Sequence, residues 1–326
     1  MRAIPCLAAA VLTLVAGVAA AGPLRDRIIE RRIQHERNEL LDDELTGLPS
    51  LPAGVRVVRD VAYGNDGEQR FDVYLPPQAK DAPVMFIVHG GGWARGDKAM
   101  RTVVENKVKR WVPKRLVVIS VNYRMVPKAA PIEQARDVAR ALAVAQANAA
   151  SWGGDPAKFI LIGHSAGAHL VALLASSPSI ATEMGVKKWL GMVLLDSAAL
   201  DVPHIMQARH FQLYDRAFGR DPAYWKSASP YHVLTQPAAP VLAVCSTRRD
   251  DACAQAGRFV DKALSLGMRA SVLEQNLSHR EINQKLGEDR RYTEEVESFL
   301  RTLDGSLARM LIMSPRMKSS AVDFQR

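Results

Sequence analysis

The sequence predicts an α/β fold in which a mostly parallel, doubly wound sheet carries helices on both faces. Short apolar runs alternate along the chain with longer runs that have helical spacing. The apolar runs are nearly continuous, as in strands that are buried on both faces. Glycine-rich turns directly follow two of these runs, after Val88 and after Ile162. Because ligands bind at the carboxyl ends of the strands in such sheets, these two turns are the candidate site.

The predicted elements begin with a hairpin. Residues Val55–Ala62 and Arg70–Leu75 alternate like two antiparallel strands, and Asn65-Asp66-Gly67 is the turn between them. From Pro83 onward strand and helix alternate. The predicted strands are Val84–Val88, Leu116–Val121, Phe159–Ile162, Leu190–Leu195, Val241–Cys245 and Ala270–Leu273. The predicted helices are Met100–Val112, Pro131–Ala149, Ala166–Ser176, Ala254–Leu266 and Asp289–Leu303.

One segment interrupts this alternation. Residues 201–236 are rich in aromatic side chains and follow the strand that ends before Asp196. We expect a small cap over the site, and the alternative is a packed excursion away from it. The chain of 326 residues, 48% of them hydrophobic, then divides into a main domain over residues 55–303, with the cap inside it, and an unpacked tail over residues 304–326.

The beginning of the chain resembles a secretory signal. Arg2 precedes an apolar core at Leu7–Val18, and the small residues Ala19, Ala20 and Ala21 offer a cleavage site. We therefore expect residues 1–21 to be removed and the protein to be exported, to a periplasm or outside the cell, with no stable membrane span. An uncleaved anchor is the alternative. Residues 22–54 are predicted to form a helical arm and a linker, in which Leu24–Leu45 is an amphipathic helix or a solvated arm.

The net charge of +9 makes the protein basic, but its Lys and Arg residues are scattered. No basic stripe is interleaved with aromatic residues, so the sequence argues against a nucleic-acid partner. Motifs for metal or dinucleotide binding, such as HExxH, CxxC or a glycine fingerprint, are also missing from the sequence. We expect no metal and no organic cofactor.

The most informative motif is Gly163-His164-Ser165-Ala166-Gly167, which has the pattern G-x-S-x-G between a predicted strand and a predicted helix. A serine at such a turn is held in a strained backbone, and bulky residues two positions away on either side would clash. The turn exposes the Ser165 hydroxyl and directs the backbone N–H of Ala166 to the place where an oxyanion would form.

A second motif, His89-Gly90-Gly91-Gly92-Trp93, follows the strand Val84–Val88. Glycines let backbone N–H groups approach a ligand oxygen without interference from side chains. We therefore expect Gly91 and Gly92 to complete an oxyanion hole with Ala166. Either motif alone could be a tight loop that binds no ligand. This alternative is much weaker when the two motifs occur together.

These two motifs resemble those of the α/β-hydrolase serine esterases, in the carboxylesterase and arylformamidase-like branch. Matching stretches are Gln69–Pro76, Val121–Arg124 and Gly153–Pro156, and the resemblance covers about Val55 to Leu303. It implies the α/β-hydrolase fold with a small cap and a serine nucleophile activated by a histidine and a carboxylate.

The other two members of this charge relay are predicted from chain order, which for this fold is serine, acid, histidine. His279 lies after the last predicted strand and is the predicted base. The family often has His-Gly-Thr-x-Asp after the preceding strand, where this chain has Cys245-Ser246-Thr247-Arg248-Arg249-Asp250-Asp251. The register is therefore open. Asp251 is favoured as the acid, Asp250 follows closely, and Asp196 is a third candidate.

Once the signal is removed, the cysteines that remain are Cys245 and Cys253. An even count in an exported protein permits a disulfide, and we expect it to pin the loop that carries Asp250 and Asp251. Two free buried thiols are the alternative.

The resulting prediction is a serine hydrolase that cleaves small-molecule carboxylic esters with small to medium acyl groups. An aryl formamidase or amidase would use the same machinery, and a non-catalytic binding protein with the hydrolase fold is a further alternative. The sequence leaves the acyl preference and the oligomeric state open.

Overall fold

The computed structural model describes residues 47–197 and 199–312. The predicted signal and the helix predicted at Leu24–Leu45 lie outside these residues, as does the last part of the chain from residue 313 onward.

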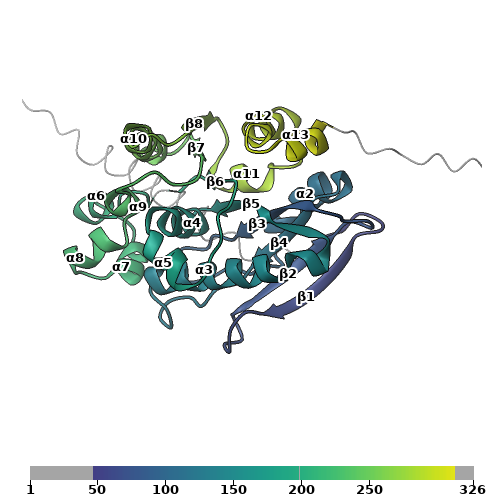
Figure 1. The fold of residues 1–326 in the computed structure, drawn as a ribbon. Helices are drawn as coiled ribbons and strands as arrows, with labels where there is room; N and C mark the ends of the chain where they lie inside the picture. Colours follow the sequence, from purple (N-terminus) through teal and green to yellow (C-terminus); the bar gives the residue numbers. More distant parts are fainter. Residues whose placement is uncertain (1–46, 198, 313–326) are drawn as a thin grey trace, which may run out of the picture.

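An eight-stranded sheet in the order β1-β2-β4-β3-β5-β6-β7-β8 forms the centre of the molecule (Figure 1). Its strands are β1 (Arg56–Ala62), β2 (Arg70–Leu75), β3 (Ala82–Val88), β4 (Val117–Val121), β5 (Gly154–His164), β6 (Gly191–Leu195), β7 (Val241–Ser246) and β8 (Ala270–Gln275). The pairs β1–β2 and β2–β4 are antiparallel, and the remaining pairs are parallel. This is the mostly parallel sheet that the sequence predicts.

The continuous apolar runs are explained by burial on both faces of the sheet. In β3 the side chains of Val84, Phe86 and Val88 belong to one core, and those of Met85 and Ile87 belong to the core on the opposite face. Successive residues of a strand point to opposite faces, so a strand that is covered on both sides must be apolar throughout.

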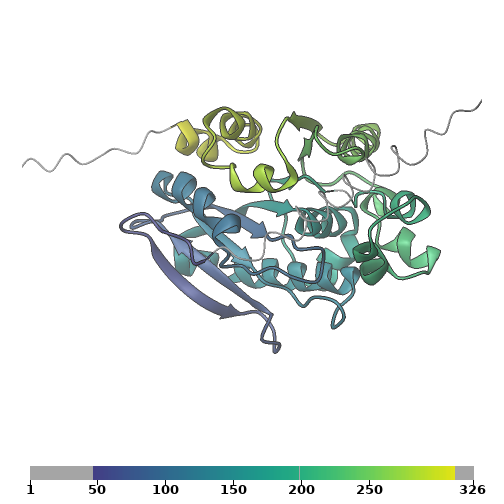
Figure 2. The same cartoon turned by 180° about the vertical axis from the view of Figure 1, so that it is seen from behind.

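Helices cover both faces, as the two opposite views show (Figures 1 and 2). The larger core contains residues of α3, α4 and α10, and the other contains residues of α2, α12 and α13. The helices are α2 (Arg101–Trp111), α3 (Pro131–Asn148), α4 (Ala166–Ser176), α5 (Pro178–Glu183), α6 (Val202–Gln207), α7 (Gln212–Phe218), α8 (Pro222–Ser227), α9 (Pro230–Val233), α10 (Ala252–Ser265), α11 (His279–Gln284), α12 (Arg290–Arg301) and α13 (Gly305–Ile312).

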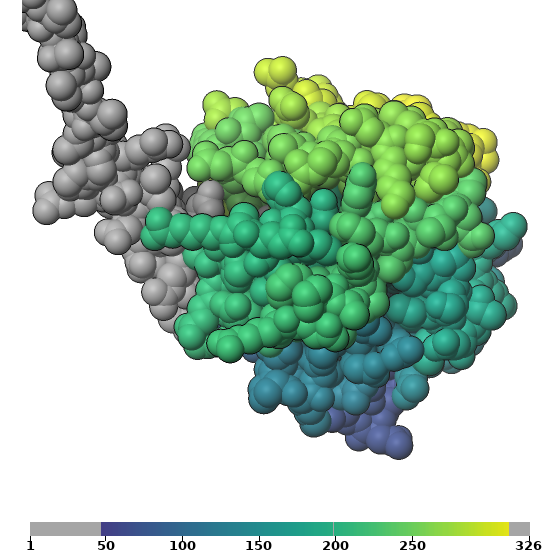
Figure 3. All heavy atoms as spheres, turned by 90° about the vertical axis from the view of Figure 1, so that its left-hand side faces the viewer, coloured from purple at the N-terminus to yellow at the C-terminus, as the bar shows by residue number. Residues whose placement is uncertain are grey.

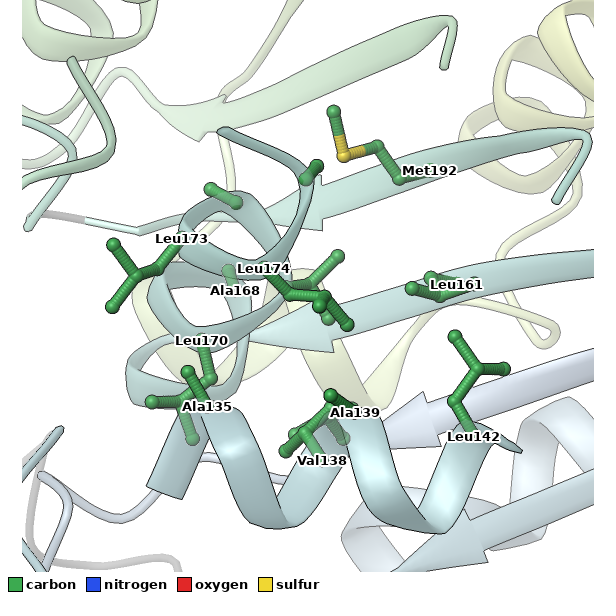
Figure 4. Close-up of a cluster of buried hydrophobic side chains, with 14 of the residues drawn as sticks. Ala135, Val138, Ala139, Leu142, Leu161, Ala168, Leu170, Leu173, Leu174 and Met192 are labelled. Carbon is green, nitrogen blue, oxygen red and sulfur yellow. The ribbon is translucent and has the colours of Figure 1, made fainter. Parts of the chain in front are cut away.

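Helix α4, which follows the G-x-S-x-G motif, is buried along its whole length. Figure 4 shows Leu170 and Leu174 of α4 together with Val138 of α3, beside Leu161 of β5. Alanines of α3 and α4 lie in the same cluster, and such small side chains let the two helices approach each other closely. The candidate nucleophile is therefore carried by an element that is packed on all sides.

The C-terminal region differs from the prediction. The sequence predicts that residues 305–312 belong to an unpacked tail, but they form α13, whose Leu307 and Leu311 are buried. Their apolar spacing of four residues places both side chains on one face of the helix, against the second core. The rest of the predicted tail lies outside the described residues.

Candidate functional site

Ser165 occupies the sharp turn between β5, which ends at His164, and α4, which begins at Ala166. Its backbone has φ 53° and ψ −118°, a conformation that residues with a side chain rarely adopt. The Ser165 N–H donates a hydrogen bond of 2.9 Å to the carbonyl of Leu195 at the end of β6. The strained turn is thus held in place by the neighbouring strand.

The two glycines of the motif are required by close approach. A Cβ on Gly163 would lie 2.4 Å from the carbonyl oxygen of Gly167, and a Cβ on Gly167 would lie 2.3 Å from that of Val88. These contacts are with backbone atoms, which cannot move aside cheaply. The sequence-based reason for the glycines, a clash two residues from the serine, is confirmed.

The His89–Trp93 loop lies directly beside this turn. A Cβ on Gly90 would come within 2.9 Å of the Ser165 Cβ, so the loop and the turn are in contact. Gly91 and Gly92 have φ values of +105° and +58°. Within the described residues, the backbone N–H groups of Gly91, Gly92 and Ala166 have no hydrogen-bond acceptor. These three groups are the predicted oxyanion hole.

Trp93 ties the glycine loop to the cap and to α4. Its indole Nε1 donates to His169 Nδ1 at 3.1 Å, and His169 Nε2 donates to the Ala228 carbonyl at 2.7 Å. Burial lowers the pKa of His169 from 6.5 to about 4, so the ring is neutral at neutral pH. The Trp93 ring also packs on Phe218 of α7, with centroids 4.8 Å apart.

The aromatic segment packs against the glycine loop. It folds into α6, α7, α8 and α9, which lie on the face that Figure 3 presents to the viewer. Leu213 of α7 is the nearest neighbour of a Cβ built on Gly92, at 3.8 Å. Helix α7 thus contacts the glycine loop, which is the position that the predicted cap requires.

His279 is positioned by both its own helix and the serine turn. It is the first residue of α11, which is capped by Ser278 and Glu281 in a reciprocal capping box. His164 Nε2 donates to the His279 carbonyl at 3.0 Å, and the two imidazole rings lie 4.5 Å apart. Since His164 precedes Ser165 directly, folding places the predicted base against the residue next to the predicted nucleophile, across more than a hundred residues of sequence.

The carboxylate paired with His279 is Asp196, which directly follows β6. Its Oδ2 lies 2.6 Å from His279 Nδ1, and its Oδ1 accepts a hydrogen bond of 2.9 Å from the Ser246 N–H. Arg249 Nη1 donates to the same Oδ2 at 2.7 Å. The Asp196 side chain is fully buried, and its backbone φ is +50°.

This environment keeps Asp196 ionised. Burial by itself would raise the pKa of the carboxyl, but the Arg249 guanidinium and the bonds from His279 and Ser246 hold that pKa well below its ordinary value. An ionised carboxylate at Nδ1 fixes the imidazole tautomer and leaves Nε2 as the basic nitrogen.

The preference for Asp251 or Asp250 as the partner of His279 is wrong. Asp251 directly precedes α10, where its carboxylate accepts from the Gln255 amide at 2.6 Å and its side chain is 43% exposed. Asp250 is exposed in the turn before α10. Both lie past the end of β7, whereas Asp196 directly follows β6, the strand hydrogen-bonded to β5, which leads into the Ser165 turn.

One sequence signal for Asp196 was available. Asp196 is a carboxylate that directly follows an apolar strand, so it lies at the edge of the sheet where the two glycine motifs also lie. No such signal points to Arg249. It directly follows Arg248 in a polar loop, and nothing in that sequence indicates that one of the two side chains is buried.

The predicted disulfide is confirmed: Cys245 at the end of β7 is bonded to Cys253 in α10, with an S–S distance of 2.10 Å. The bridge closes the loop that contains Ser246 and Arg249, two residues that bind Asp196.

In residues 47–197 and 199–312, no group of three or more His, Cys, Asp or Glu side chains is arranged to hold a metal ion. Over the same residues, no helix has the length and apolar character that crossing a membrane requires.

The chain is similar to several known proteins. A model of the BD-FAE family matches residues 71–252, more than half of the chain. A probable isoprenylcysteine alpha-carbonyl methylesterase of Oryza sativa is 33% identical over 118 residues, which are 36% of this chain and 27% of that protein. Esterase LipC of Mycobacterium tuberculosis is 29% identical over 205 residues, 58% of this chain and 50% of LipC. The chain thus spans between about a quarter and a half of these relatives.

Solved structures match over more of the chain. Esterase B from Lactobacillus rhamnosis has a TM-score of 0.63 at 19% identity, and the match covers 87% of this chain and 94% of esterase B. A truncated carbohydrate esterase from gut microbiota has a TM-score of 0.65 at 18% identity, covering 82% of this chain and all of that one. At these identities the match shows a shared fold.

Proposed function

Because the chain belongs to the BD-FAE family and has the α/β-hydrolase fold, we propose that it is a serine esterase that cleaves small-molecule carboxylic esters. The observation that carries the proposal is the buried pair of Asp196 and His279 beside the strained Ser165 turn. A strained serine, a buried carboxylate and an interposed histidine are the parts that nucleophilic acyl transfer requires.

In the proposed mechanism, His279 Nε2 takes the proton of Ser165 Oγ as that oxygen attacks the ester carbonyl. The backbone N–H groups of Gly91, Gly92 and Ala166 stabilise the oxyanion of the tetrahedral intermediate. His279 then donates the proton to the departing alcohol. Water, activated by the same imidazole, attacks the acyl-enzyme and releases the acid.

Asp196, rather than Asp250 or Asp251, takes the third role in this proposal. It holds the imidazole tautomer and balances the charge that the ring acquires. The cap supports a preference for small to medium acyl groups, because Leu213 and the aromatic side chains around Trp93 lie close over the glycine loop. The named relatives include esterases and methylesterases, which agrees with an ester substrate.

Labelling with a fluorophosphonate tests the nucleophile. We expect stoichiometric labelling of the folded protein and none in Ser165→Ala. Ser298→Ala is the matched control, because Ser298 lies exposed on α12 and its hydroxyl donates to the Glu294 carbonyl of the same helix. No labelling of the folded wild-type protein would favour a non-catalytic binding protein.

Substrate class is tested by a series of p-nitrophenyl esters of increasing chain length, run beside an aryl acetate and an N-formyl aniline. We expect the highest kcat/KM with short acyl chains and a preference for the acetate. A preference for the formyl anilide would instead indicate a formamidase that uses the same residues.

The disulfide also supports a proposal about location. Disulfides persist in oxidising compartments, so we propose that the protein is exported, as the signal-like sequence of residues 1–21 suggests. Cell fractionation with an antibody against the folded domain tests this, and recovery in the cytosolic fraction alone would contradict it.

A further inference from the structure

A buried arginine joins the pair of Asp196 and His279. The Arg249 side chain is only 7% exposed, and its Nη1 lies 2.7 Å from Asp196 Oδ2. The same Nη1 lies 3.2 Å from His279 Nδ1 and donates to the Asp196 carbonyl at 3.3 Å. Arg249 and His279 therefore bind the same carboxylate oxygen from two sides.

Once the structure has placed Arg249, its position can be compared with the His-Gly-Thr-x-Asp pattern. When Thr247 is aligned with the threonine of His-Gly-Thr-x-Asp, Arg249 takes the place of the aspartate. A cation thus stands where that pattern supplies an anion, and the anion comes from the end of β6 instead. The disulfide closes the short loop on which Arg249 is presented.

This arrangement changes the electrostatics of a protonated histidine. A carboxylate alone favours the imidazolium, because opposite charges attract at short distance. Here the charge of Asp196 is already balanced by a guanidinium, which also lies against the imidazole and repels a positive charge on it.

Of the other charged groups near His279, Glu281 lies in the first turn of the same helix, where Lys285 and Arg248 pair with its carboxylate. From β5, His164 is neutral, because burial and the neighbouring His279 lower its pKa well below 6.5. From α12, Tyr292 presents a neutral hydroxyl that donates to Ile282. From α2, Lys107 adds a further positive charge, bound to Asn283 of α11.

We propose that Arg249 is a positioning residue that shares Asp196 with His279 and extends catalysis to lower pH by keeping the base neutral. The inference rests on the proposed function, since it concerns the same site. It assigns to Arg249 the role of orienting the carboxylate and of opposing charge on the imidazole in the free enzyme.

The test is the pH dependence of kcat/KM with a neutral ester, followed in a pH-stat, for wild type, Arg249→Gln and Arg249→Lys. Removing the charge in Arg249→Gln should move the acid limb to higher pH by about one to three units, the usual effect of a single charge at this distance. Arg249→Lys, which keeps the charge, should leave the limb within about half a unit of wild type. Arg248→Gln, an exposed neighbour paired with Glu281, is the matched control and should leave it unchanged.

The proposal is overturned if the acid limb of the kcat/KM profile lies at the same pH in wild type and in folded Arg249→Gln, even if kcat falls. An Arg249 with a purely structural role would lower the rate without moving this limb.

An NMR titration of the His279 ring in the Ser165→Ala background separates this inference from the proposed function. It requires no turnover, so it reports on Arg249 even if no ester is hydrolysed. The ring resonance should titrate at higher pH when Arg249→Gln is added, and an unchanged titration would refute the inference whatever the enzyme assays show.

Discussion

Replacing Asp196 by Asn tests the assignment of the acid most directly. The change keeps the shape of the side chain but substitutes an amide for the carboxylate that accepts from His279, Arg249 and Ser246. An NH₂ group at the Oδ2 position would face two donors. His279 would then take the tautomer with its proton on Nε2, and the basic nitrogen needed by Ser165 would be lost.

These contacts determine how far kcat/KM and the free energy of unfolding should fall in Asp196→Asn. Loss of the correct tautomer should lower kcat/KM by about 10⁴-fold. Two hydrogen bonds to a charged acceptor are lost, at about 1.5–3 kcal/mol each. Arg249 also loses its ion pair with Asp196. We therefore expect the free energy of unfolding to fall by about 3–5 kcal/mol.

The assay is kcat/KM with p-nitrophenyl acetate at about pH 8, above the reference pKa of a free imidazole, together with urea unfolding followed by circular dichroism. Asp251→Asn is the matched control, because its carboxylate is partly exposed and pairs with Gln255. An exposed polar pair contributes at most about 1 kcal/mol, so the control should stay within about fivefold of wild type.

The assignment of Asp196 fails if Asp196→Asn is folded and keeps more than a tenth of the wild-type kcat/KM. It also fails if Asp251→Asn loses as much activity as Asp196→Asn while remaining equally stable.

Three further predictions concern stability. Gly167→Ala should destabilise the protein by about 3 kcal/mol and abolish activity, because its Cβ would lie 2.3 Å from the Val88 carbonyl; near wild-type urea unfolding would contradict this. Cys253→Ser should lower the free energy of unfolding by roughly 2–3 kcal/mol, the chain-entropy value for so short a loop, and thermal unfolding with and without reductant measures it. His169 has its pKa lowered from 6.5 to about 4, so it binds a proton in the unfolded chain before it does in the folded one. The free energy of unfolding should therefore be unaffected by His169 above about pH 6.5 and fall by about 3 kcal/mol by about pH 4. Urea unfolding at each pH measures this dependence, and His169→Gln should reduce it.

The elements of the fold were largely predictable because their signals are local. A strand buried on both faces needs a continuous apolar run, and the predicted strand Arg70–Leu75 and helix Ala166–Ser176 match the observed bounds. The errors lie where a short segment is ordered by tertiary contacts. Helix α13 is stabilised by packing of Leu307 and Leu311 on the second core, and so short a segment without that packing would not form a stable helix.

The sequence by itself determined the turn that carries Ser165, because Gly163, Ser165 and Gly167 are close in the chain and only glycine fits the backbone contacts on either side. It also indicated His279, through the order of elements in the chain. The identity of the paired carboxylate was decided by the tertiary structure. Asp196, Arg249 and His279 are separated by at least 30 residues, and their side chains meet because the strands that precede them, β6, β7 and β8, end at the same edge of the sheet. Which of several aspartates turns inward there depends on hydrogen bonds and burial that no local pattern encodes.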